Sequence, residues 1–184
     1  MSTSAAPSEF VAALRSLHAH SRATQVMLAE IPPPRRLAPF SVAISGTVPG
    51  PDDDLADGTF VVLYDPDGQV GWTGPFRIVL ALTAPLEPEL AQDALLPAVA
   101  WSWLLDAFEP VGVFGLGGTV TRTMSEPFGE LASGGRRDRL DLRASFSPEG
   151  ADLSGYLAAW VELVATFAGV PPLPDGVAAF GLQR

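Results

Sequence analysis

The sequence predicts a single α+β domain in which helices pack on one mostly antiparallel sheet of about five strands. Segments of alternating apolar residues form two groups, at 40–83 and 113–147, and a helix-length apolar segment separates the groups. Turn-rich connections join the strands within each group, which favours antiparallel pairing. A length of 184 residues suits one domain, and we identify no linker that would separate two. The predicted order of elements is therefore α-β-β-β-α-β-β-α.

The N-terminal half is predicted to hold one helix and three strands. The helix spans 8–18, where Ser8 can cap the first turn and apolar residues follow at helical spacing. Prolines at 31–39 predict a stiff extended connector, because proline fixes φ and restricts the residue before it. Strands are expected at 40–48, 59–64 and 76–83, separated by an acidic loop at 49–58 and a turn at Asp65–Gly68.

The next helical segment spans 87–108 and is predicted to break near 93–97. Proline is tolerated in the first turn of a helix but not in its interior, so Pro97 favours a second helix that starts there. That second helix is apolar nearly all round. The pattern predicts burial on more than one side.

Two strands and a last helix complete the prediction. The strands are expected at 113–124 and 139–147, and the helix at 153–168 with one apolar stripe. Gly169 is predicted to end this helix in a left-handed conformation. The terminal residues, 1–7 and 171–184, are expected to pack loosely.

Composition argues against several classes of function. The net charge of −10 disfavours nucleic acid and anionic membranes as partners, and the only basic cluster, Arg136, Arg137 and Arg139, is typical of a solvated turn. Cysteine is absent, and His18 and His20 lie two apart, on different sides of a helix. We therefore expect no metal site and no cofactor. The N-terminus lacks the pattern of a secretory signal, so a cytoplasmic protein is expected.

The densest group of hydrogen-bonding side chains lies at the end of the strand predicted at 113–124. Side chains alternate along a strand, so Arg122 shares the inward face with apolar neighbours, and Ser125 and Glu126 follow it. These three residues are candidates for binding an anionic ligand through the planar guanidinium. The alternative is a buried structural Arg122, satisfied by carbonyls or by an acid on a neighbouring strand, with Glu126 on the surface.

The four tryptophans divide between core and surface. Trp101 and Trp160 are predicted to anchor the core between the later helices and the sheet, with the indole N–H bonded to a carbonyl. Trp72 lies in a turn-like GWTG segment and is expected to be partly exposed. Trp72 and Trp103 are the candidates for a surface that contacts another protein.

Two resemblances extend this interpretation. The segments IPPPRRLAPFSVAIS, LEPELAQDALLPAVAWSWLLDAF, GTVTRTMSEPFG, LRASFSP and LAAWVELVATFAGVPPLPDGV resemble, in the same order, the blocks of an uncharacterised actinobacterial family, the domain of unknown function numbered three thousand. That resemblance implies a cytoplasmic actinobacterial protein and no established catalytic residues. The order of elements also resembles that of type III secretion chaperones, small acidic proteins that often dimerise.

Two functional hypotheses follow. The first is a non-enzymatic interaction or adaptor protein with a protein partner or a second copy, because the hydrophobic fraction of 47% is high for so acidic a chain. The second is a small-molecule binder or enzyme with a pocket near Arg122, Ser125 and Glu126. The absence of a nucleophile motif counts against catalysis, whereas acid–base chemistry by a carboxylate stays open.

Overall fold

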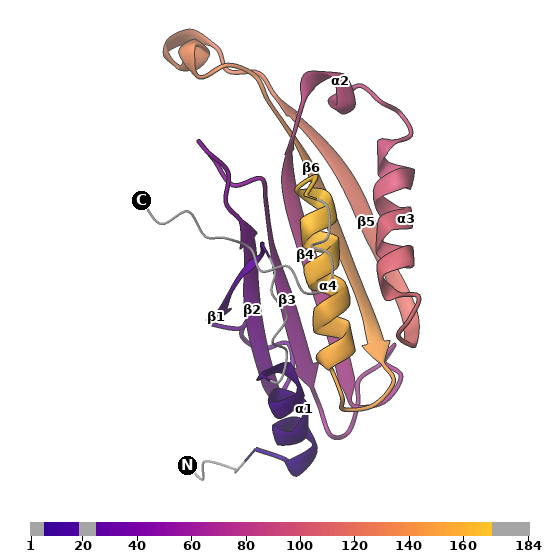
Figure 1. The fold of residues 1–184 in the computed structure, drawn as a ribbon. Coiled ribbons are helices and arrows are strands. Elements are labelled where there is room, and N and C mark those ends of the chain that lie inside the picture. The colour runs from indigo at the N-terminus through magenta and orange to yellow at the C-terminus, as the bar shows by residue number, and fades with distance from the viewer. Residues whose placement is uncertain (1–5, 19–24, 171–184) are drawn as a thin grey trace.

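The computed structural model describes residues 6–18 and 25–170, and within them one six-stranded antiparallel sheet carries helices on one face (Figure 1). The predicted α+β class is confirmed, with six strands rather than five. In chain order the elements are α1 (Ser8–His18), β1 (Met27–Ile31), β2 (Phe40–Val48), β3 (Ala56–Tyr64), β4 (Phe76–Leu86), α2 (Pro88–Ala91), α3 (Leu96–Phe108), β5 (Val113–Ser125), the short 3-10 helix η1 (Gly129–Gly134), β6 (Arg137–Pro148) and α4 (Ser154–Phe167).

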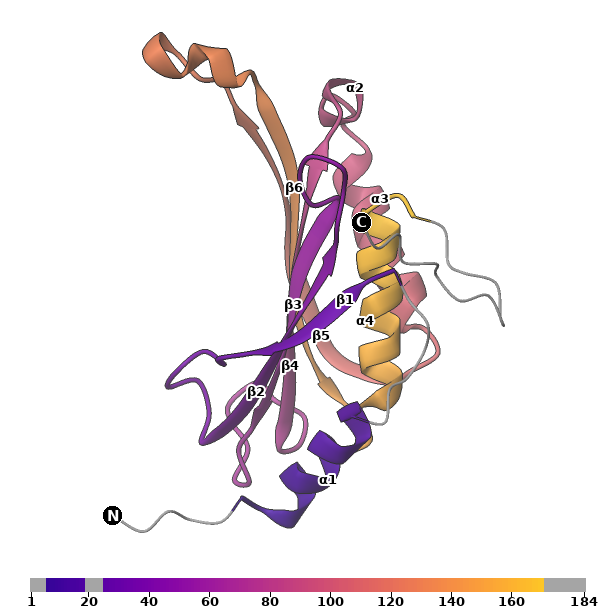
Figure 2. The ribbon, with the colours of Figure 1, turned by 60° about the vertical axis from the view of Figure 1, so that its left-hand side comes forward.

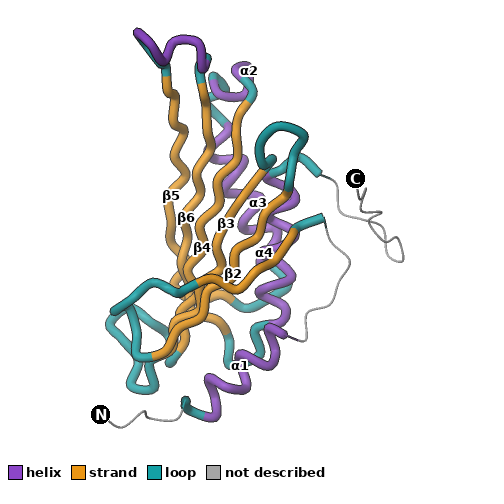
Figure 3. The backbone as a smooth tube through the Cα atoms, turned by 90° about the vertical axis from the view of Figure 1, so that its left-hand side faces the viewer, coloured by secondary structure: helices purple, strands orange, loops and turns teal. Residues whose placement is uncertain are grey.

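The strands lie in the order β1-β2-β3-β4-β6-β5, and every neighbouring pair is antiparallel. The last hairpin is therefore added with β6 against β4, which leaves β5 at one edge of the sheet and β1 at the other. Figure 3 shows the uncovered side of the sheet, with α3 and α4 behind it. We call this uncovered side the open face.

The hydrophobic core lies between the sheet and α1, α3 and α4 (Figure 2). Strand β4 shows how the sequence positions it, because Phe76, Ile78, Leu80 and Leu82 alternate with residues of the open face and are all buried. Helix α4 packs on β2, β3 and β4, and the ring of its Trp160 lies tilted against that of Phe60, with ring centroids 5.6 Å apart. None of the helices among the described residues is long and apolar enough to cross a membrane.

Several predicted elements are confirmed closely. The first helix and the strand at 40–48 have the predicted bounds, and helix 87–108 divides into α2 and α3 with Pro97 in the first turn of α3. Gly169 has a φ of +68°, and its N–H donates to the carbonyl of Thr166, so it ends α4 as predicted. His20 and the terminal segments 1–5 and 171–184 lie outside the described residues.

Two segments differ from the prediction. Strand β1 was not predicted, because Met27–Ile31 is mostly exposed and has no alternating pattern. The acidic loop is shorter than expected, since β3 begins at Ala56 and pairs with the far end of β2. Pairing with β2 therefore defines β1 and lengthens β3 at its start, beyond what local composition indicates.

Helix α3 is buried on one side only, which corrects the expectation from its composition. Leu96, Ala100, Leu104 and Phe108 face the core, while the exposed side of α3 includes Val99 and Leu105. The helix lies over β5 at the margin of the sheet, and α4 is its only helical neighbour with substantial contact among the described residues. No other described element therefore covers the outer apolar side of α3.

The indole of Trp160 also differs from the prediction. The side chain is fully buried, but Nε1 has no hydrogen-bond partner among the described residues. The ring packs on the backbone of Gly46 and beside Phe60, an apolar setting that offers no carbonyl in reach of the N–H. Trp101 is half-buried and packs against the edge of the hydrophobic core.

Both tyrosines of the chain are buried, and their burial makes the free energy of unfolding change with pH in the alkaline range. Burial raises the pKa of Tyr64, and its hydrogen bond to Glu9 raises it further; burial also raises the pKa of Tyr156. The folded protein therefore binds the two phenolic protons more tightly than the unfolded chain does. The resulting contribution to the free energy of unfolding is complete below about pH 10 and is lost as the pH rises above that value.

Urea denaturation at a series of pH values from neutral to alkaline should show that the free energy of unfolding falls as the pH rises. The variant Tyr64→Phe should show a shallower fall, because one of the two phenols no longer ionises. An equally steep fall in Tyr64→Phe and the unaltered protein would contradict the assignment.

Candidate functional site on the β5–β6 arm

The outer half of the β5–β6 hairpin, residues 121–139, projects beyond the rest of the protein, and we call it the arm (Figures 1 and 2). At the base of the arm β6 also pairs with β4, as far as Leu86 opposite Asp138; beyond that point β5 and β6 form a two-stranded ribbon, with Ser125 opposite Arg137. The 3-10 helix η1 closes the tip. All three residues of the predicted ligand site therefore lie on the arm.

The register of the hairpin separates Arg122 from Ser125. Arg122 is opposite Leu140, whose side chain is buried on the helix-covered face, whereas Ser125 is opposite Arg137 on the open face. Residues an odd number apart on a strand point to opposite faces. The structure consequently does not bring Arg122 and Ser125 into one site.

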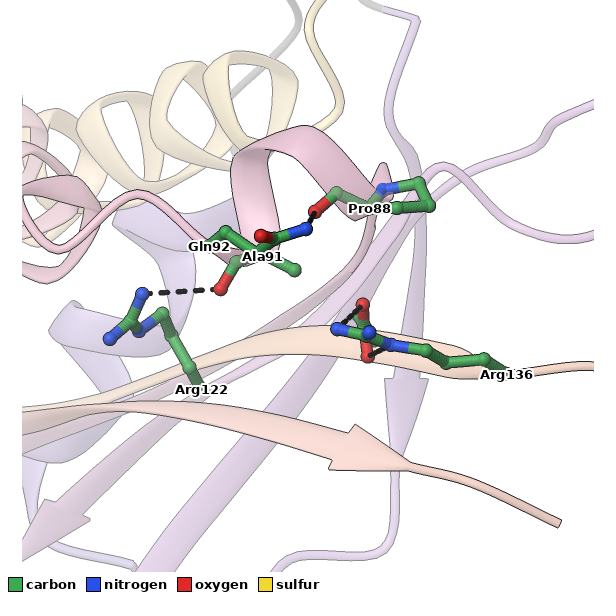
Figure 4. Close-up of polar contacts among 6 residues, drawn as sticks. Pro88, Ala91, Gln92, Arg122 and Arg136 are labelled. Carbon is green, nitrogen blue, oxygen red and sulfur yellow. Dashed lines mark hydrogen bonds and ion pairs between the residues drawn. The ribbon is translucent and has the colours of Figure 1, made fainter.

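Arg122 lies on the predicted face but is exposed rather than buried. Its Nη1 donates hydrogen bonds to the carbonyl oxygen of Ala91, at 3.2 Å (Figure 4), and to the carbonyl oxygen of Asp93, at 2.7 Å. Ala91 ends α2, so the guanidinium satisfies carbonyls at the end of that short helix. The carbonyl partners agree with the structural alternative, whereas the expected burial is wrong because the arm extends past α3.

A second arginine of the arm makes an ion pair with a buried carboxylate, which the sequence analysis does not predict. Arg136 Nε donates to Asp138 Oδ1 at 2.9 Å, and Arg136 Nη2 lies 2.7 Å from Oδ2. Asp138 is buried, while Arg136 is about a third exposed. The hydrogen bond to Asp138 raises the pKa of Arg136, and the charge of Glu126 adds to this effect. The sequence did contain a signal, since Asp138 lies two residues before Leu140 and therefore on the same face of β6 as the buried Leu140 and Leu142.

A hollow of about 280 Å³ lies at the tip of the arm. Its lining is Ser125, Glu126, Pro127, Leu131, Gly134, Gly135 and Arg137. Ser125 and Glu126 are thus brought together as predicted, but the guanidinium at the hollow belongs to Arg137. The lining is mainly apolar apart from these polar groups, so it suits an apolar group better than a highly charged one.

Large apolar side chains are exposed along the arm. Met124 is 66% exposed, Phe128 is 79% exposed and Leu131 is 73% exposed. They lie at the end of β5, in the loop after it and in η1, so they surround the tip. Apolar side chains concentrated on a projecting element are typical of a surface that contacts another protein.

The other two candidate residues lie away from the arm. Trp72 is half-buried on the open face, where it packs on the small cluster of Ala43, Val61 and Leu63 and borders a hollow of about 560 Å³. Trp103 packs edge-on against Phe167 of α4, with ring centroids 5.7 Å apart. Its partial burial leaves less surface for a partner than the arm offers.

The open face is polar along β5 and β6. Thr119, Thr121 and Thr123 of β5 lie opposite Arg143, Asp141 and Arg139 of β6. On β4, Thr83 donates a hydrogen bond to Asp141 at 2.6 Å. Burial raises the pKa of Asp57, which faces Thr83 from β3. The described residues contain no group of three or more metal-ligating side chains that could hold a metal ion.

Comparison with known proteins gives one match. A family model described as a protein of unknown function, DUF3000, matches residues 6–178. No curated protein and no solved structure matches the chain. Since the family model covers nearly the whole sequence, the chain belongs to the DUF3000 family.

Proposed function

We propose that this protein is a non-enzymatic interaction or adaptor protein of the actinobacterial cytoplasm, and that it holds a protein partner on the tip of the arm. One observation carries the proposal: Met124, Phe128 and Leu131 are 66–79% exposed on an element that projects from the body of the protein. Scattered exposed apolar residues need no explanation, but a concentration of them does.

The physical argument rests on what burial of the tip would contribute. Each Å² of apolar surface removed from water is worth about 25 cal/mol, so covering three large side chains supplies a central part of a binding free energy. Strand β5 fixes the backbone of Met124 before binding, and η1 fixes that of Leu131, which lowers the entropy lost on association. The net charge of −10 keeps a chain with such a patch soluble.

The likeness in element order to type III secretion chaperones is compatible with this proposal. A chaperone-like adaptor would hold another protein on exposed apolar surface, which the arm provides. The shared order of elements concerns the fold alone, so it is a weaker reason than the exposed tip.

Capture from the cytosol of an actinobacterial host tests the proposal. The double variant Phe128→Ser/Leu131→Ser should lose, at least tenfold, the proteins that the unaltered protein retains, because the tip no longer has apolar surface to bury. The matched control is Leu37→Ser/Val70→Ser, which removes two exposed apolar residues elsewhere. Equal capture by all three proteins would contradict the proposal.

A second candidate function is favoured by the hollow beside Ser125, Glu126 and Arg137. In this reading the protein binds a small molecule with an apolar body and an anionic group, which Arg137 would hold through its planar guanidinium. Native mass spectrometry of the purified protein would then show a retained small molecule that Arg137→Ala loses. Retention by Arg137→Ala, or no retained molecule in either protein, would contradict this candidate.

A further inference from the structure

Strand β5 forms a long edge of the sheet that no other strand among the described residues pairs with. It has 13 residues and pairs with β6 on one side only, and α3 is the only other element with substantial contacts to it among the described residues. It contains no proline and a single charged side chain, Arg122. Edge strands expose unpaired N–H and C=O groups, and natural proteins commonly protect them with proline, several charges or a cover. Here only a bulge between Phe114 and Gly117 interrupts the edge.

Helix α3 adds an apolar stripe along the same edge. A Cβ atom built on Gly118 would lie 2.9 Å from Cζ3 of Trp101, so the Trp101 ring packs on the middle of β5. Leu105 follows Trp101 by four residues, one turn further along the same side of the helix, and is 45% exposed. The edge of the sheet and this stripe form one continuous surface.

The charges of this surface are arranged with opposite signs at its two ends. Glu109 follows Leu105 by four residues, directly after the end of α3, near the start of β5. Arg122 lies near the other end of β5 and bonds carbonyls that precede α3. Because α3 and β5 run in opposite directions, Trp101 lies between the two charges.

We propose that a second copy of this chain pairs with β5 in antiparallel fashion, about a two-fold axis at Thr119, so that Thr119 of each copy lies opposite Thr119 of the other. The edge is self-complementary under such an axis, because Arg122 of each copy faces Glu109 of the other and the two Trp101–Leu105 stripes meet. The sheets become one continuous sheet, and the arms point away from each other. This inference names one partner within the proposed function, whereas the arm tip stays free for others.

Sedimentation equilibrium tests the proposal. The unaltered protein should be a dimer, and Leu105→Arg should be a monomer, because a charge would be buried in each half of the interface. The control Leu37→Arg places the same charge on another exposed apolar residue and should remain a dimer. A monomeric unaltered protein, or a dimer that Leu105→Arg leaves intact, would overturn the proposal.

Charge reversal separates the proposed pairing from a loss of folding. Arg122→Glu and Glu109→Arg should each weaken the dimer about tenfold, and the double variant should recover most of the loss, because the opposite signs face each other again. A double variant that is weaker than both single variants would exclude the pairing of Arg122 with Glu109 across the axis.

Cysteine cross-linking locates the axis, because the chain contains no cysteine of its own. Thr119→Cys should form an intermolecular disulfide, since residues opposite each other in an antiparallel pair have Cα atoms about 4.5–5.5 Å apart. Ala29→Cys on β1, at the other edge, should not. Cross-linking through Ala29 alone would overturn the proposal. A monomer that still binds partners through the arm would leave the proposed function intact and remove only the dimer.

Discussion

Alanine at position 46 should destabilise the protein by about 1–3 kcal/mol, because the core has no space for its methyl group. A Cβ atom at Gly46 would lie 2.7 Å from Cη2 of Trp160 and 3.1 Å from Cγ1 of Val26. The indole cannot retreat easily, since it is fully buried between α4 and the sheet. Chemical denaturation of Gly46→Ala measures the loss.

The control for this substitution is Gly117→Ala in β5, where a Cβ atom meets nothing within 4 Å. Its free energy of unfolding should stay within about 0.5 kcal/mol of that of the unaltered protein. If Gly46→Ala were as stable as Gly117→Ala, the close packing of Trp160 on β2 would be wrong.

Removal of the Arg136 side chain should lower the free energy of unfolding of the protein. The buried carboxylate of Asp138 would lose the guanidinium that holds both of its oxygens. Partial exposure of Arg136 keeps the expected loss below that of a fully buried pair. The neighbouring substitution Arg137→Ala is the matched control, since Arg137 is exposed on the open face and should change stability little.

A double-mutant cycle tests the cause of this loss. Replacing both partners, in Arg136→Ala/Asp138→Leu, leaves no buried charge and should recover most of the stability lost by Arg136→Ala. If the double variant were less stable than Arg136→Ala alone, burial of an unpaired carboxylate would not be the reason for the loss.

The parts of the fold that alternation predicts well are those buried on one face. Strand β4 alternates between core and open face along its length, and the stripe of α4 is buried as expected. The exposed strand β1 carries no such pattern, so only its pairing with β2 defines it. The position of β6 between β4 and β5 depends on contacts between distant segments, which local patterns do not encode.

For the candidate residues Arg122, Ser125 and Glu126, alternation predicts the face of the strand but not the geometry of a site. Alternation places Arg122 on the helix-covered face, yet its exposure depends on how far the arm extends past α3. The pair formed by Arg136 and Asp138 was missed, because three arginines beside turn residues are typical of a solvated loop. The exposure of Met124, Phe128 and Leu131 was missed as well, because it depends on how far the end of the hairpin projects from the rest of the protein, which local patterns do not encode.

Site-specific photo-cross-linking at the tip of the arm tests the central claim most directly. A photoreactive amino acid would replace Phe128 in one variant and Leu37, another exposed apolar residue, in the control. Irradiation of living cells should give a discrete protein adduct from position 128 and none from position 37, because the account places the partner on the tip. No adduct at position 128, or the same adduct at both positions, would contradict the account.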